Sequence, residues 1–182
     1  MMRYISILLI LFLTACGGGE QSKDSTAKTE NTEEMLLSEI DKYESMLSKE
    51  EAMDTKTNIR KTLIDLYSSY ATSYSMKKQA PEMLFHAGTE SVNVEEYNQA
   101  INYLKRLETG YHEYIKRPEA IYLIAFIYEN HLNKKGPAKE YYNKVINEYP
   151  EHVLASQAKQ SIDILMLSDE ELIKKFQENN PG

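Results

Sequence analysis

The sequence predicts an all-α protein whose helices stack in antiparallel pairs. Apolar residues recur at intervals of three and four along most of the chain, which is the spacing of one helix face. No strand-length run of alternating apolar and polar residues bounded by hairpin turns is found. One helical pattern returns after 37 or 38 residues, a period typical of a helical solenoid. We therefore expect about three antiparallel helix pairs plus a C-terminal helix within residues 33–182; the alternative is a plain helical bundle with a coincidental period.

The chain begins with a short segment that has the features of a secretory signal. Arg3 gives it a basic start, an apolar run spans residues 5–13, and small residues precede Cys16. The apolar run is shorter than the roughly 20 residues that a membrane-spanning helix needs. Residues 13–16, Leu-Thr-Ala-Cys, resemble a bacterial lipobox. The resemblance implies cleavage between Ala15 and Cys16, and acylation of Cys16 with chains such as palmitate; the alternative is an ordinary signal peptide with a chance cysteine.

This resemblance implies a lipid-anchored protein of the bacterial cell envelope. Several acyl chains, at about 0.8 kcal/mol per buried CH₂ group, hold a protein firmly on a membrane. Position 17 is Gly rather than the Asp that resembles an inner-membrane retention signal, so we expect the outer membrane. Residues 1–15 are then a lipoprotein signal peptide. Residues 16–32 are the lipidated cysteine and a flexible tether with almost no apolar residue, whose reach is roughly 20–25 Å.

Helical patterns begin at Glu33 and follow one another to the end of the chain. Asn31 and Glu34 have the spacing of a capping box at the first start, and Asn93 and Glu96 have it at a later one. The first two apolar stripes consist of Leu36, Ile40, Tyr43 and Leu47, and of Ile59, Leu63, Tyr67, Tyr70 and Tyr74.

Prolines mark several of the later helix boundaries. Pro81, Pro118 and Pro137 stand where a helix starts, and Pro150 follows one that ends. Residues 151–167 resemble one more first helix of a pair. Ser168 with Glu171 predicts the cap of a last helix over 169–179.

The pattern that returns is a helix pair with small residues at fixed positions. Pro118 lies 37 residues after Pro81, and Ala138 lies 38 residues after Ala100. Small residues at such positions let two helices cross closely, while large residues fill the space between crossings. The other equivalent pairs are Gly88 with Ala125, Leu104 with Tyr142, Leu107 with Val145, and Tyr111 with Tyr149.

Over residues 57–160 this pattern resembles the tetratricopeptide repeat (TPR). The family's first helix carries a bulky residue, an apolar residue followed by a small one, and an aromatic residue. Those places are filled by Leu84, Ala87, Gly88 and Ser91, and by Ile121, Ile124, Ala125 and Tyr128. Ser91 and His112 depart from the pattern, because an aromatic residue and a proline are usual there. Together with the lipobox, the pattern is similar to that of bacterial envelope TPR lipoproteins, such as the β-barrel assembly lipoprotein and Tol–Pal-associated proteins.

The family resemblance implies that the first helices of successive pairs line a concave binding face. We expect two rows on that face to contact a partner: Phe85, Thr89 and Asn93, and Tyr122, Phe126 and Asn130. Aromatic rings supply contact area, and asparagine amides can pair with a peptide backbone. The alternative is that the three aromatic residues pack against neighbouring helices.

Neither composition nor motifs indicate an enzyme, a cofactor, a metal site or nucleic-acid binding. The net charge is −7 and no basic stripe is present, which is unfavourable for binding nucleic acid. An acylated Cys16 leaves no thiol for a disulfide, a nucleophile or a metal. None of the four histidines pairs at i, i+4 with another in a metal motif. Acidic runs occur at helix starts, where they favour the helix dipole rather than forming a catalytic pair.

Two functions are compatible with these features. The first is a non-catalytic scaffold that is anchored in the membrane and binds an envelope protein or peptide during outer-membrane or wall assembly. The second is a protein that captures a peptide or small ligand for a membrane machine. An enzyme would require a polar cluster that only the fold brings together.

Replacing Cys16 by Ser should release the protein from membranes, because the acylated sulfur is the expected anchor. Fractionation of cells followed by immunoblotting measures this. Continued tight membrane association of the Cys16→Ser variant would contradict the anchor.

Overall fold

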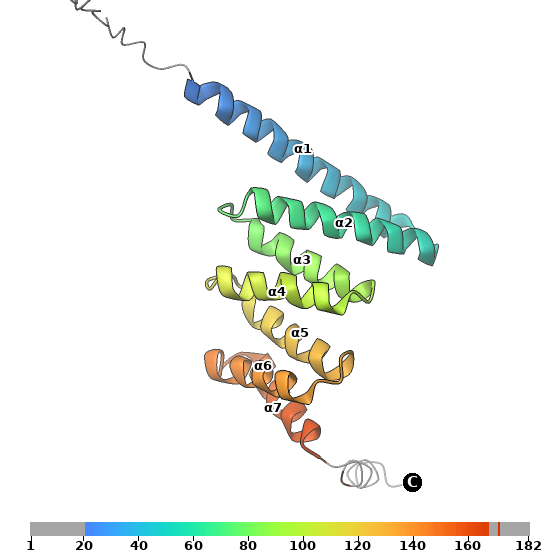
Figure 1. Ribbon diagram of the computed structural model, residues 1–182, viewed down its shortest axis with the longest axis vertical. Helices are drawn as coiled ribbons and strands as arrows, with labels where there is room; N and C mark the ends of the chain where they lie inside the picture. The colour runs from blue at the N-terminus through green and yellow to red at the C-terminus, as the bar shows by residue number, and fades with distance from the viewer. Residues whose placement is uncertain (1–20, 168–170, 172–182) are drawn as a thin grey trace, which may run out of the picture.

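The computed structural model describes residues 21–167 and 171, with side chains described from Thr32 onward. The described residues form seven α-helices and no strand, which confirms the predicted all-α solenoid resembling TPR proteins. Successive helices pack on one another, and Figure 1 shows them stacked in chain order from α1 to α7. The helices are α1 (Gln21–Lys49), α2 (Met53–Ser73), α3 (Ala80–Asn93), α4 (Tyr97–Gly110), α5 (Arg117–Asn130), α6 (Lys135–Glu148) and α7 (Val153–Leu165).

The close crossing of α3 and α4 depends on Gly88. A Cβ atom added there would lie 2.7 Å from Cγ and Cδ2 of Leu104 on α4, a distance that real side chains do not tolerate. Ala100, Ala125 and Ala138, the other small residues of the repeat, are fully buried. The structure thus confirms that these four positions lie where helices pack closely.

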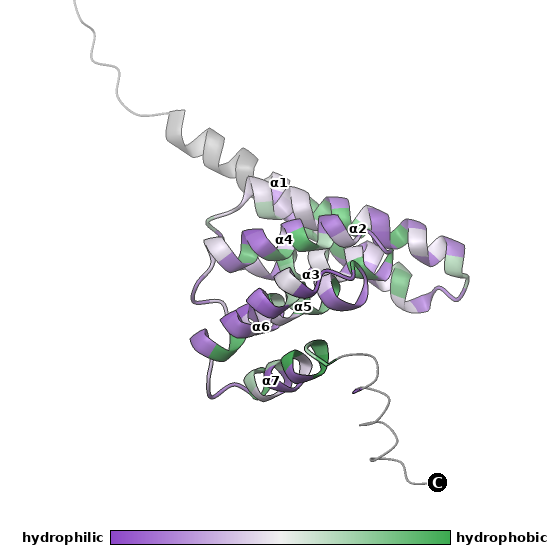
Figure 2. Cartoon of the chain, turned by 60° about the horizontal axis from the view of Figure 1, so that its bottom comes forward, coloured by the Kyte–Doolittle hydropathy of each residue, from purple (hydrophilic) through white to green (hydrophobic). Residues whose placement is uncertain are grey.

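The core continues from one helix pair to the next. Leu104 and Tyr142 are equivalent in the repeat and both are fully buried, as are Leu107 and Val145. Three clusters of buried residues overlap along the stack, centred in turn on α1–α3, α2–α5 and α5–α7. In Figure 2 the helices carry both hydrophobic and hydrophilic residues, as expected for helices that bury one side.

The repeat also extends to the ends of the second helices. Tyr111 and Tyr149 are the C-terminal caps of α4 and α6, with φ of −136° and −135°. The Tyr111 hydroxyl donates to the Ser75 carbonyl oxygen at 2.9 Å, and the Tyr149 hydroxyl accepts from Arg117, the first residue of α5. Tyr111 therefore ties the α3–α4 pair to the turn that precedes it, whereas Tyr149 ties the two helices of the α5–α6 pair to each other.

A buried ion-pair network joins α4, α5 and α6. Arg117 is buried, donates Nε–H to the Glu108 carbonyl oxygen at 2.8 Å, and pairs with Glu148 at 2.7 Å. Lys144 pairs with the buried Glu108 carboxylate. Burial alone would lower the pKa of Arg117, but its hydrogen bonds to Tyr149 and Glu148 raise that pKa. The sequence did not predict this network, because its members come from three helices.

The predicted start of the first helix at Glu33 is wrong. α1 begins at Gln21, so residues 21–32 are helical rather than a flexible coil, and the predicted capping box at Asn31 and Glu34 lies inside the helix. No Gly or Pro interrupts the sequence from Gln21 to Lys49, and an established helix propagates readily through such residues. The role of residues 16–32 as a tether between lipid and domain stays a prediction.

Other predicted boundaries have mixed outcomes. Pro81 and Pro118 lie in the first turns of α3 and α5, and the extra helix after Pro150 is α7. The capping box at Asn93 is wrong, because Asn93 is the last residue of α3 and its amide donates to Glu90. Ser168 and the helix predicted over 169–179 fall outside the described residues, apart from Glu171.

Replacing Gly88 by Val should destabilise the protein by about 1–3 kcal/mol, because the added carbons collide with Leu104. Urea unfolding followed by circular dichroism measures this. Gly110→Ala is the matched control, since nothing lies within 4 Å of a Cβ added there. A Gly88→Val variant as stable as the control would contradict the close crossing.

Candidate functional site

The described helices lack two kinds of site. Among residues 32–167 and 171, no group of three or more His, Cys, Asp or Glu side chains could hold a metal ion. Within the described chain, no helix combines the length and the apolar character needed to cross a bilayer.

The predicted row on α3 is only partly open to solvent. Phe85 is half-buried against the core, and the Lys116 ammonium lies 5.4 Å from the centre of its ring. Lys116 also pairs with Glu82 at 2.7 Å, and this hydrogen bond lowers the pKa of Glu82. Thr89 is half-buried and donates to the carbonyl oxygen of His86, whereas Asn93 is exposed.

The row on α5 is more accessible. Tyr122 is half-buried and meets Tyr142 edge to face, with ring centres 5.3 Å apart. Phe126 is 38% exposed, and Asn130 is exposed with its amide donating to the Phe126 carbonyl oxygen. The alternative prediction, packing against neighbouring helices, thus describes Phe85 and Tyr122 better than Phe126.

An aromatic cluster at the end of the α5 row was not predicted. His131, the C-terminal cap of α5, stacks on Tyr97 at the start of α4, with ring centres 4.2 Å apart. Phe126 meets the same His131 ring edge-on at 5.8 Å. Phe126 therefore stands in a group of three rings. The sequence gives no sign of it, because Tyr97 and Phe126 belong to different helix pairs.

Comparison with known families identifies one of the helix pairs. The tetratricopeptide-repeat family model matches residues 119–152. These residues comprise most of α5, all of α6 and the turn that follows. A comparison with curated proteins finds no match. Together with the stacked pairs, the match supports a TPR protein, and TPR domains are interaction scaffolds that bind protein partners.

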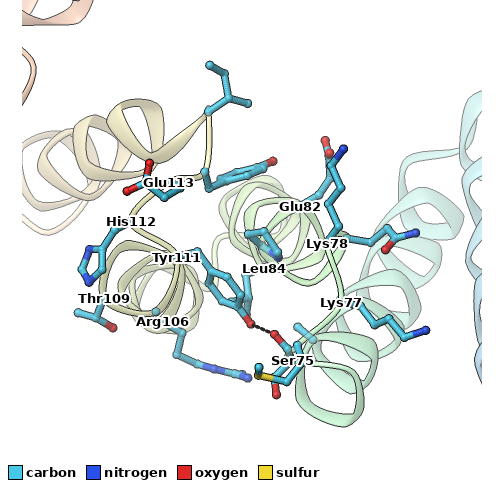
Figure 3. A pocket seen from close by; sticks show the side chains of 17 residues that line it. Ser75, Lys77, Lys78, Glu82, Leu84, Arg106, Thr109, Tyr111, His112 and Glu113 are labelled. Atoms are coloured by element: carbon cyan, nitrogen blue, oxygen red, sulfur yellow. Dashed lines mark hydrogen bonds between the residues drawn. The ribbon is translucent and has the colours of Figure 1, made fainter.

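A second surface is an open cleft of about 1250 Å³ between two turns. Residues 75–79 border it on one side and residues 109–115 on the other, as Figure 3 shows. Leu84, Ala71 and Pro81 contribute apolar lining, and Arg106, Lys77 and Lys78 contribute positive charge. The hydrogen bond from Tyr111 to Ser75 joins the two turns across the cleft (Figure 3). Burial raises the pKa of Tyr114, another lining residue, to about 12.

The predicted lipidation site lies elsewhere. Cys16, Ala15 and the rest of residues 1–20 fall outside the described residues. Lipidation, cleavage and the signal peptide therefore stay predictions.

The two rings of the α5 row should differ in their effect on stability. Tyr122→Ala should lower the free energy of unfolding by about 1–3 kcal/mol, since it removes packing against Tyr142. Phe126→Ala should cost less, about 0.5–1 kcal/mol, because Phe126 is 38% exposed and loses mainly its edge contact with His131. Thermal unfolding of the matched variants measures both. A larger loss for Phe126→Ala would show that this ring is core.

Proposed function

We propose that this protein is a lipid-anchored, non-catalytic scaffold of the bacterial cell envelope that binds a protein partner through α3 and α5. The observation that carries the proposal is the equivalence of the two rows. Phe85 and Tyr122, Thr89 and Phe126, and Asn93 and Asn130 occupy matching positions on consecutive first helices. Repeated positions of this kind form a continuous binding surface in helical solenoids.

The chemistry of the rows suits an extended peptide or a partner helix. Phe126 presents an exposed ring, stiffened by its contact with His131. The exposed amides of Asn93 and Asn130 bond only within their own helices, to Glu90 and Phe126. They can exchange these local bonds for a partner's backbone at little cost, since surface hydrogen bonds of this kind contribute little net stability.

The proposed location depends on the lipobox. Acylation of Cys16 would hold the domain at a membrane, and Gly17 in place of Asp favours the outer membrane. An anchored scaffold needs only modest affinity, because the membrane raises the local concentration of its partners. Assembly of outer-membrane or wall components is the setting that the lipoprotein resemblance suggests.

Site-specific photo-crosslinking in cells tests the binding face. A benzophenone amino acid replacing Phe126 should give one dominant protein adduct, identified by mass spectrometry. The matched control is the same substitution at Asn102, which is exposed on α4. The double variant Asn93→Ala, Asn130→Ala should reduce the adduct several-fold while leaving helicity unchanged.

Other outcomes would count against the scaffold. Equal adducts from positions 102 and 126 would remove the proposed face. A small molecule that co-purifies with the domain, with no protein adduct, would favour the ligand-capture function instead.

A further inference from the structure

The turns that lead from one helix pair to the next each expose an apolar side chain. Met76 lies between α2 and α3 and is 96% exposed, and Ile115 lies between α4 and α5 and is 82% exposed. Val153, at the start of α7, is 67% exposed. Met76 and Ile115 are the two most exposed large apolar side chains of the described residues. Single exposed apolar side chains are common on protein surfaces, so it is their recurrence at successive turns that distinguishes these.

These three turns lie on one edge of the stack. Figure 1 shows the turns α2–α3, α4–α5 and α6–α7 on the same side of the molecule, which is also the side where α1 begins. The opposite edge carries the turns within pairs. The exposed side chains are therefore collected on the edge nearest the N-terminal end of the described chain, which we call the inter-pair edge.

The start of α1, and with it the expected anchor, lies on the same side of the stack as this edge (Figure 1). Only residues 16–20 separate the sulfur of Cys16 from the helix that begins at Gln21. Five residues span at most roughly 17 Å when fully extended. An acylated Cys16 would therefore hold the first turn of α1 near the lipid surface. The turns that carry Met76 and Ile115, and the start of α7 with Val153, lie on this same side of the stack.

The cleft described above opens between two of these turns. Met76 and Ile115 stand among its lining residues. The Arg106 side chain extends toward Ser75 (Figure 3), and its guanidinium donates to the neutral Thr72 hydroxyl at 3.2 Å. Lys77 and Lys78 belong to the same turn as Met76. The cleft lining also contains Glu82, which pairs with Lys116, and Glu113. The apolar tips with Arg106 and Lys78 beside them match a phospholipid surface, which offers acyl chains below a layer of phosphates.

We propose that the inter-pair edge docks on the membrane surface, with Met76 and Ile115 inserted between lipid headgroups and Arg106 and Lys78 facing phosphates. This rests on the proposed lipid anchor. The apolar side chains are single tips on separate turns, whereas the centre of a protein interface is a contiguous apolar patch. Weak insertion suffices, because the tether makes docking an intramolecular step. The α3 and α5 rows then remain available to a partner.

Lipid quenching of single labels tests the docking. Cys16 is the only cysteine of the sequence, and its sulfur is acylated in the lipidated protein. Met76→Cys and Ile115→Cys therefore each introduce a single free thiol for labelling. Met53→Cys is the matched control, since Met53 is 74% exposed on the opposite edge. Each lipidated variant carries an environment-sensitive fluorophore and is reconstituted in vesicles of phosphatidylethanolamine, phosphatidylglycerol and a doxyl-labelled phospholipid. Labels at 76 and 115 should lose most of their emission, and the label at 53 should not.

A parallel arm separates docking from anchoring. The same labelled chains with Cys16→Ser and an N-terminal hexahistidine tag are held on vesicles that contain a nickel-chelating lipid. Quenching at 76 and 115 in this arm supports docking even if mass spectrometry finds no lipid on the natural chain. Adding Met76→Asp should reduce the quenching at 115 several-fold. Equal quenching at positions 53, 76 and 115 would overturn the proposal. So would the absence of quenching at 76 and 115 in both arms. Labels that become shielded only after an envelope protein is added would show that this edge binds protein rather than lipid.

Discussion

The approach of α3 to α4 at Gly88 is the constraint on which the stack depends. With no side chain at Gly88, Leu104 can lie directly over the backbone of α3. The two helices therefore pack closely enough for the next helix pair to stack on them. Ala125 takes the same place in the next pair, in one cluster with Tyr142. Each helix pair is too small to bury its own apolar surface, so it is stable only when neighbours cover both sides. The spacing set at these crossings therefore decides whether the next pair can pack at all.

Much of this architecture could be predicted, because it depends on residue size at a fixed interval. Pro81 and Pro118 mark helix starts by their fixed φ, and the small residues mark crossings by their lack of bulk. The first helix was predicted less well. Its start at Gln21 is set by the absence of a helix breaker rather than by an apolar pattern, and a pattern search detects only the latter. At Asn93 a pattern predicted a helix start that is not there. The spacing of Asn93 and Glu96 fits a capping box, but Asn93 is the last residue of α3.

The candidate site was harder to predict than the fold. The spacing of four correctly grouped Tyr122, Phe126 and Asn130 on one helix, but it could not tell which rings face the core. Exposure depends on how other helices pack: Tyr122 meets Tyr142 of α6 edge to face, while Phe126 meets the His131 ring at the end of its own helix. Tyr97 joins this group from another helix pair. The ion pairs of Arg117 with Glu108 and Glu148 likewise join residues whose proximity is decided by tertiary packing.

The placement of α1 at one end of the stack has a mechanical consequence. α1 packs chiefly on α2, where Ile40 is buried beside Ile59 and Leu63, and Lys77 pairs with Glu33 at 2.8 Å. If the chain is anchored at its N-terminus as proposed, a load between the anchor and a partner bound at α3 and α5 would enter through this terminal helix and pass first to α2. A force applied at the N-terminus would separate α1 from α2 first. The helices joined by the ion pairs of Arg117, α4 to α6, would remain folded. The outermost contact of the stack would thus act as the first point of yield.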